Sequence, residues 1–137
     1  MLVMAQGAHA ELKIDITKGN VEPMPIAVTT LTGQGAGEAT GASISGVIAA
    51  DLERSGLFRP IGKDAFIEQV TNGDAIPRYA DWRQINANAI VTGTVTPSGG
   101  DKVRISVRLW DAVAEQQLVG KEYNTYARNW RRVSHLI

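Results

Sequence analysis

The sequence contains no cysteine and only two histidines. The absence of cysteine excludes thiol catalysis, thiolate metal sites and disulfide bridges. It leaves the cellular compartment open, because a domain with a sufficient core needs no crosslink. His9 lies near the amino end of the chain and His135 near its carboxyl end. If His9 belongs to a leader, the folded domain retains only His135. One histidine cannot form a histidine metal cluster, and we expect no hydrolytic triad. The sequence therefore predicts a noncatalytic protein that needs no cofactor and takes no small-molecule substrate.

The chain also lacks an excess of charge of either sign. Fourteen Lys and Arg residues balance fourteen Asp and Glu residues, so no overall field would hold a polyanion or an anionic membrane at physiological salt. No apolar run approaches the roughly 18 residues that a spanning helix needs. Nucleic acid is therefore not an expected partner, and the protein is expected to be peripheral to a membrane at most. With 137 residues, the chain has the length of one domain.

The amino terminus carries a pattern typical of a leader. A short apolar run is followed by Ala8-x-Ala10 and then by the charged Glu11, which resembles the end of a signal peptide, although no charged region stands upstream. Two interpretations stay open: residues 1–10 are the remainder of a signal peptide, or they are a native tail with a chance A-x-A. Either way, the domain is expected to span residues 11–137, with its last helix cut short at Ile137.

Alternating and helical spacings of apolar residues predict the order of elements. The first half is predicted to form a strand over 12–16, a buried strand over 26–31, a helix over 44–55 with Ser43 as N-cap and Gly56 as its stop, and a brief strand over 58–61. At most one helical turn is expected within 64–70, followed by a short helix that Asp81 caps and that carries Trp82 and Ile85. The remainder is predicted to form a strand over 89–95, a turn over 97–101, strands over 103–109 and 117–125, and a helix that Asn129 caps and that begins at Trp130.

This order predicts the fold class. The last three strands should form an antiparallel meander, while a strand, a helix and a further strand precede them. We expect an α+β fold of two layers, with a mixed β-sheet of about five strands and two to three helices on one face. Trp82 and Trp110 are expected to be buried or half-buried parts of the core.

Two segments suggest alternative functions. The glycine-rich stretch over 33–41, GQGAGEATG, follows a strand and precedes a helix, as nucleotide-binding loops do. However, it lacks the lysine of a Walker A loop and the spacing of the dinucleotide fingerprint, so a flexible connector is the preferred interpretation. The three arginines Arg128, Arg131 and Arg132 stand near Tyr126 and Trp130, which suggests a nucleic-acid patch. The preferred interpretation is that Trp130 packs on the sheet while the arginines are solvated.

The segment over 11–16 has a different character. Its apolar residues Leu12, Ile14 and Ile16 alternate with polar ones, as in a strand with one apolar face. A short strand near a free terminus has unpaired backbone groups, so it can leave its own sheet or add to the sheet of another protein.

Two motifs carry a family resemblance. The first runs from Ile44 to Leu52, ISGVIAADL, and continues in Ser55-Gly56-x-Phe58-x-Pro60, and the second is Val91-x-Gly93-x-Val95-Thr96-Pro97. In this order and spacing, the chain resembles the amino-terminal domain family of TolB, the periplasmic component of the Tol-Pal envelope system. The resemblance covers essentially all of residues 11–137.

The resemblance implies a fold similar to anticodon-binding domains and a periplasmic interaction protein that supports outer-membrane integrity and cell division. It implies that the mature amino-terminal segment docks on the partner protein TolA, with the contacts falling on Glu11, Leu12, Lys13, Ile14 and Asp15 if cleavage follows Ala10. In this family, Pal and colicins bind a β-propeller that follows the domain, and no propeller repeats occur in this chain. The alternative that the residues leave open is a small α/β module that binds nucleotides or nucleic acid.

Overall fold

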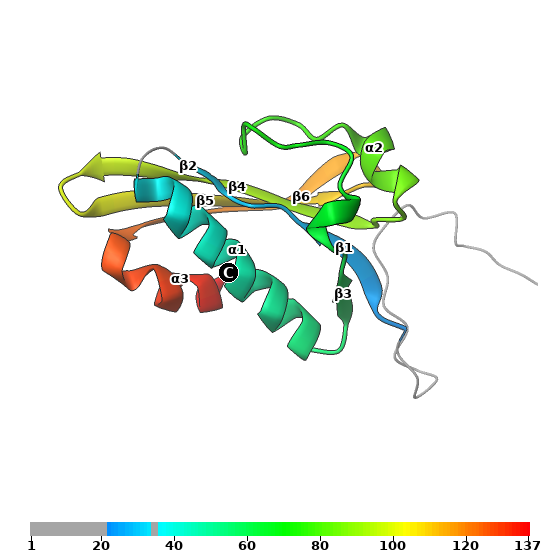
Figure 1. Ribbon diagram of the computed structural model, residues 1–137, viewed down its shortest axis with the longest axis horizontal. Helices are drawn as coiled ribbons and strands as arrows, with labels where there is room; N and C mark the ends of the chain where they lie inside the picture. Colours follow the sequence, from blue (N-terminus) through cyan, green and yellow to red (C-terminus); the bar gives the residue numbers. More distant parts are fainter. Residues whose placement is uncertain (1–21, 34–35) are drawn as a thin grey trace, which may run out of the picture.

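A computed structural model describes residues 22–33 and 36–137 of the protein. Six strands form one mixed sheet in the order β3-β1-β4-β5-β6, with β2 paired to β4 on the same side as β1 (Figure 1). The elements are β1 (Met24–Val28), β2 (Thr32–Gly33), α1 (Ala36–Arg54), β3 (Phe58–Pro60), the 3-10 turn η1 (Lys63–Ala65), α2 (Tyr79–Gln84), β4 (Ala89–Gly99), β5 (Lys102–Asp111), β6 (Gln116–Tyr126), the 3-10 turn η2 (Ala127–Asn129) and α3 (Trp130–Leu136). The predicted α+β class with a mixed sheet is confirmed. The predicted strand over 12–16 lies outside the described residues.

The parallel half of the sheet centres on β1, which pairs in parallel with β3 and β4. Ile26, Ala27 and Val28 are all buried, which confirms that this strand is covered on both faces. The strand does not run to residue 31 as expected. The hydroxyl of Ser45 accepts a hydrogen bond from the backbone N–H of Leu31 and lies 2.9 Å from the carbonyl oxygen of Thr29. These contacts turn the backbone out of the ladder before β2 begins.

The antiparallel half is the predicted meander of β4, β5 and β6. Its first turn is tighter than expected, because β4 continues to Gly99 across a register shift at Pro97. Gly99 and Gly100 have φ angles of +118° and +57°, values that glycine adopts at little cost. The chain therefore reverses at Gly100 and Asp101, and not over the whole of residues 97–101.

Helix α1 begins at Ala36, so the predicted start near Ile44 was wrong. Glycine has a poor helix propensity, which is why a connector was expected over 33–41. Packing overrides that propensity: a Cβ atom at Gly37 would lie 3.0 Å from the carbonyl oxygen of Val95, and one at Gly41 would lie 2.2 Å from that of Leu31. These glycines let the helix lie directly against the strands. The predicted stop is confirmed, since Gly56 has a φ angle of +79°.

The sheet carries a hydrophobic cluster on each face. Alternate strand residues such as Ile26 and Val91 pack with α1 and α3 on one face, and Ala27 and Ile90 pack with Trp82 of α2 on the other. Figure 1 shows α1 and α3 below the sheet and α2, with the segment that precedes it, above. Two helices thus share one face, as predicted, while α2 lies on the opposite face. Helix α2 and the segment before it cover the second face because the central strands are buried on both sides.

Both tryptophans predicted to be buried belong to the cluster above the sheet, and this prediction is confirmed. The indole N–H of Trp82 donates to the carboxylate of Glu68 at 2.8 Å, and that of Trp110 donates to the hydroxyl of Thr92 at 2.8 Å. Each buried donor is therefore satisfied, as burial of a polar group requires.

The short helices differ from expectation mainly at their starts. Helix α2 begins at Tyr79, two residues before the predicted cap, and the Asp81 carboxylate pairs instead with Arg78 at 2.9 Å. Helix α3 begins at Trp130 as predicted, but the side chain of Asn129 donates to the hydroxyl of Thr125 and does not cap the helix. The turn expected within 64–70 is the single 3-10 turn η1.

Candidate interaction surfaces

The segment predicted to bind a partner, Glu11, Leu12, Lys13, Ile14 and Asp15, lies outside the described residues. The described chain enters the domain at Glu22, just before β1. The amide of Met24 at the start of β1 donates to the carbonyl oxygen of Leu57 at 2.9 Å. The chain therefore joins the domain at the corner where β1 meets β3.

An apolar groove lies under the sheet between α1 and the end of α3. It has a volume of about 480 Å³. Its floor is formed by side chains of the strands and its walls by the two helices: Ile26, Phe58, Val91, Val107, Leu109, Val119 and Lys121 from the sheet, Ile48, Asp51 and Leu52 from α1, and Ser134, His135 and Ile137 from the last residues. Most of these residues are hydrophobic, so the groove can hold apolar groups but offers few partners for polar ones.

One charged contact closes the rim of this groove. The Nδ1 atom of His135 lies 2.7 Å from Oδ2 of Asp51, and the guanidinium of Arg54 lies 2.7 Å from the other carboxylate oxygen. The hydrogen bond from His135, followed by that from Arg54, lowers the pKa of Asp51 below its ordinary value of 3.8. Sequence reasoning missed this contact because 84 residues separate its partners and no local pattern links them.

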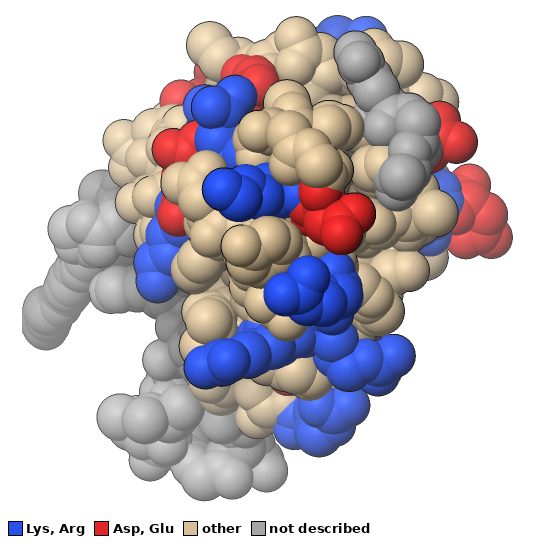
Figure 2. Space-filling view, turned by 90° about the vertical axis from the view of Figure 1, so that its left-hand side faces the viewer, with Lys and Arg blue, Asp and Glu red and all other residues tan. Residues whose placement is uncertain are grey.

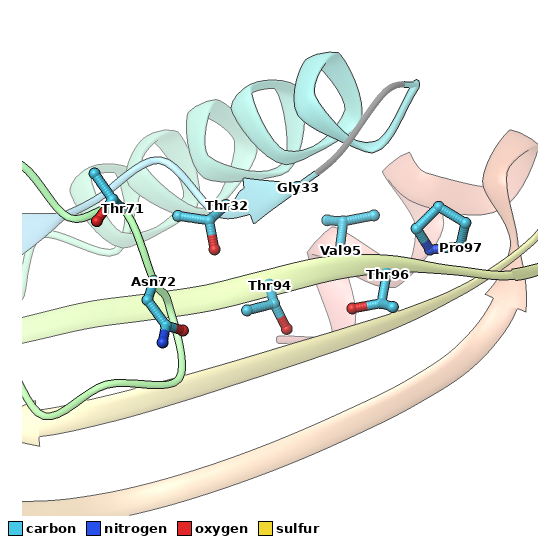
Figure 3. Close-up of a pocket in the computed structure, with 8 residues that line it drawn as sticks. All are labelled: Thr32, Gly33, Thr71, Asn72, Thr94, Val95, Thr96 and Pro97. Carbon is cyan, nitrogen blue, oxygen red and sulfur yellow. The ribbon is translucent and has the colours of Figure 1, made fainter.

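A polar cleft lies on the upper face, where the loop before α2 crosses the sheet. Its volume is about 300 Å³, and it is lined by Thr32, Gly33, Thr71, Asn72, Thr94, Val95, Thr96 and Pro97. Figure 3 shows Thr94 and Thr96 on the same side of β4, with Asn72 beside them from the loop. The hydroxyl of Thr32 accepts a hydrogen bond from the Gly73 amide at 3.0 Å. None of the lining side chains is ionisable, so the cleft offers hydroxyl and amide groups but no acid or base.

The glycine-rich segment has a structural role in the described chain. A Cβ atom at Gly33 would lie 2.5 Å from the carbonyl oxygen of Gly37, which adds to the close contacts of Gly37 and Gly41 with the strands. The described glycines are thus explained by packing, whereas a phosphate loop needs its backbone free to face the ligand. Residues 34–35 lie outside the description.

The described residues contain no group of three or more His, Cys, Asp or Glu side chains that could hold a metal ion. No helix within residues 22–33 and 36–137 combines the length and apolar character that crossing a membrane requires.

Burial lowers the pKa of Lys63, and burial also raises the pKa of Tyr79. Since Lys63 donates to the Thr30 hydroxyl and Tyr79 packs on Trp110, both residues have structural partners.

A model of the TolB amino-terminal domain family matches residues 12–118 of this chain. The chain belongs to this family. The match includes most of the predicted docking segment, continues through α1, α2 and β5, and ends within the first residues of β6. The residues that carried the resemblance, from Ile44 to Pro60 and from Val91 to Pro97, all lie within it.

Solved structures with the same fold include TolB itself. The chain is 20% identical to TolB from Acinetobacter baumannii, with a TM-score of 0.65 over 84% of this chain and 26% of that one. Lipoprotein GNA1162 from Neisseria meningitidis is 17% identical (TM-score 0.58, 76% of this chain and 81% of that one), and the LpoB carboxy-terminal domain from Salmonella enterica is 8% identical (TM-score 0.57, 76% and 82%). At these identities the likeness concerns the fold alone. The chain spans about a quarter of the Acinetobacter TolB.

Proposed function

We propose that this TolB amino-terminal domain is a noncatalytic interaction module of the Tol-Pal system. It acts in the periplasm and docks on TolA through its segment Glu11–Asp15, and this contact supports outer-membrane integrity and cell division. The observation that supports the proposal is the family match that begins at Leu12, because residues 12–15 of the proposed docking segment fall within the matched range. Pal and colicins are not assigned to this chain.

The chemistry of the segment suits docking by strand addition. Leu12 and Ile14 would point to one side of an extended segment and supply apolar anchors, while the backbone N–H and C=O groups pair with an exposed strand of the partner. Ile16 would extend the same row. The segment would have two docking places of similar free energy, one on its own protein and one on TolA, so a ligand that favours either place shifts the population.

The proposed noncatalytic role is supported by the surfaces described above. The polar cleft is lined without an ionisable side chain. The apolar groove carries Lys121 and, at its rim, one histidine and one carboxylate that are bonded to each other. Acid–base catalysis needs a titratable group directed at a substrate site. A nucleotide-binding role is less well supported, because the described glycines of the 33–41 stretch are occupied in packing α1 against the strands.

Isothermal titration against the carboxy-terminal domain of TolA from the same organism tests the proposal. The chain that begins at Glu11 should bind, and a matched chain that begins at Ile16 should not, with unchanged circular dichroism. Leu12→Ala/Ile14→Ala should weaken binding about 10-fold or more, since burying each apolar side chain contributes about 1.5–3 kcal/mol. The control Thr17→Ala/Lys18→Ala, which lies outside the docking segment, should bind within a few-fold of the parent. Binding that survives removal of Glu11–Asp15 would contradict the assignment.

A further inference from the structure

Four basic side chains gather at the end of the molecule formed by the β4–β5 turn, the end of β6 and the start of α3. Lys102 lies opposite Tyr126 in the ladder of β5 and β6, and the amide of Ala127 donates to the carbonyl oxygen of Asp101 at 2.7 Å. These contacts bring Lys102 next to the segment that carries Arg128, Arg131 and Arg132. We call Lys102 and these three arginines the basic end.

Two of the three arginines stack on aromatic rings and do not pair with carboxylates. The guanidinium carbon of Arg128 lies 4.3 Å from the centre of the Tyr126 ring, and that of Arg131 lies 4.9 Å from the centre of the Trp130 ring. Within the described part of the chain, none of the four basic side chains forms an ion pair. A guanidinium stacked by its face on a ring keeps the N–H groups at its edge able to bind an oxyanion.

The surroundings leave this end positive although the whole chain is neutral. The last eleven residues, 127–137, contain no Asp or Glu. The nearby carboxylate of Glu122 is paired with Arg104 at 3.1 Å, which leaves Asp101 in the turn and Glu38 in the first turn of α1. Figure 2, which faces this end, shows Lys and Arg side chains gathered in its lower half with few acidic ones among them. An anion approaching from this side meets mainly positive charge.

We propose that the basic end binds the surface of an anionic phospholipid membrane. Beside Lys102, a depression of about 210 Å³ is lined by Ser98, Lys102, Asn124, Thr125 and Tyr126, which offer an ammonium, hydroxyl and amide groups to a lipid phosphate. Tyr126 is 40% exposed, and aromatic rings with a polar edge suit the headgroup region. The inference does not rest on TolA docking.

The arrangement favours a membrane over nucleic acid. Lys102 lies at the start of β5 beside the turn, Arg128 lies in the 3-10 turn η2, and Arg131 and Arg132 lie in α3, a helix of only seven residues. Within the described residues, the depression beside Lys102 is lined by none of the three arginines, so it does not join the four cations into a groove that could follow a phosphate backbone. Helix α3 is too short to read a duplex groove along its length. A membrane needs only several cations on one side of the molecule, each of which strengthens binding about five-fold near an anionic surface.

Co-sedimentation with vesicles tests this proposal on the whole chain. We expect binding to vesicles that contain phosphatidylglycerol and none to pure phosphatidylcholine at about 0.1 M salt, with loss of binding at about 1 M, where the Debye length is about 3 Å. Arg128→Gln/Arg131→Gln/Arg132→Gln should weaken binding on the order of 100-fold, since three cations are removed. The corresponding Arg→Lys variant, which keeps the charges, should bind within a few-fold of the parent.

The matched control removes three exposed arginines from other parts of the molecule. Arg54→Gln/Arg59→Gln/Arg78→Gln changes the net charge equally and should retain binding. Equal loss in both triple variants would show a net-charge effect and overturn the proposal, as would absence of binding to the anionic vesicles. Tighter binding to a DNA or RNA oligonucleotide than to these vesicles, lost in the basic-end variant, would also overturn it in favour of a nucleic-acid surface.

Discussion

At the scale of single residues, the contacts of Asp51 determine how two helices pack together. Its carboxylate joins two helices, since it accepts from Arg54 within α1 and contacts His135 of α3 at 2.7 Å. Val133 and Trp130 of α3 pack into the same core cluster as Ile48 of α1. The Asp51–His135 contact therefore adds a directional bond to apolar packing and fixes how the two helices face each other.

This contact predicts a pH dependence of stability. Because the pKa of Asp51 is lowered in the folded protein, its carboxylate contributes stability that is fully present above the ordinary pKa of 3.8 and is lost as the pH falls through the folded value. We expect Asp51→Asn to lower the free energy of unfolding by a constant amount near pH 5. The difference from the parent should shrink steadily below about pH 4. Urea denaturation at several pH values measures it.

The control is Glu53→Gln, two residues along the same helix, where no ion pair is formed within the described residues. Its unfolding free energy should follow the parent at each pH to within about 0.5 kcal/mol. A difference between Asp51→Asn and the parent that stays constant down to pH 3 would show that the carboxylate is not linked to folding in this way.

At the scale of elements, α1 illustrates how packing can override helix propensity. Gly37, Gly41 and Ser45 repeat at every fourth position, so they lie on one side of the helix. That side approaches the end of β1 closely enough for the Ser45 hydroxyl to lie 2.9 Å from the carbonyl oxygen of Thr29. The carbonyl oxygen of Gly41, one turn earlier in the same helix, lies equally close, and the hydroxyl can donate to one of the two at a time. The repeat of small residues is thus a helix-to-sheet contact surface.

Two glycines of α1 give opposite predictions for the same substitution. A Cβ atom at Gly41 would lie 2.2 Å from the carbonyl oxygen of Leu31, while one at Gly46 would meet nothing within 4 Å. Gly41→Ala should therefore destabilise the protein by about 1–3 kcal/mol through overpacking. Gly46→Ala should stabilise it by about 0.5–1 kcal/mol through helix propensity.

Thermal or urea unfolding of the two alanine variants measures both effects. Each variant serves as the control for the other, because both replace a glycine of α1 with alanine. If Gly41→Ala stabilised the protein as Gly46→Ala is expected to, α1 would not approach the strands as closely as described, and the glycine-rich segment would again be free to serve as a connector or loop.

At the scale of the whole molecule, the sheet is covered unevenly. Residues of β1 and the first half of β4 are buried from both faces, whereas most of β6 is exposed. Strand β6 is also the last strand of the sheet, so among the described elements only β5 pairs with it. The molecule therefore has a well-covered parallel half and a thinly covered antiparallel edge, near which the apolar groove lies.

This asymmetry predicts the pattern of amide hydrogen exchange. The slowest amides should lie in β1 and in Ala89–Val95, and should report global unfolding with a free energy of about 5–15 kcal/mol. Amides of β6 that point away from β5 should exchange orders of magnitude faster. Exchange followed by NMR gives both sets. Uniform protection across β4 and β6 would mean that the outer edge of β6 is covered.

Local signals in the sequence were sufficient for part of the fold. The stop of α1 at Gly56 depends on one backbone angle, and the meander of β4, β5 and β6 depends on alternation within each strand, so both were predicted. The burial of Trp82 and Trp110 followed from side-chain size alone. The predicted docking segment Glu11–Asp15 remains a prediction, since it lies outside the described residues.

The sequence by itself thus determined the family, the α+β class and the elements whose causes lie within a few residues. Only the tertiary structure decided the start of α1, the face that α2 covers, the Asp51–His135 contact and the assembly of the basic end. The physical reason is the same in each case: the deciding partner is distant in the chain. Gly41 contacts Leu31 across a strand-to-helix connection, and Lys102 lies beside the segment that carries the three arginines only because β5 and β6 pair.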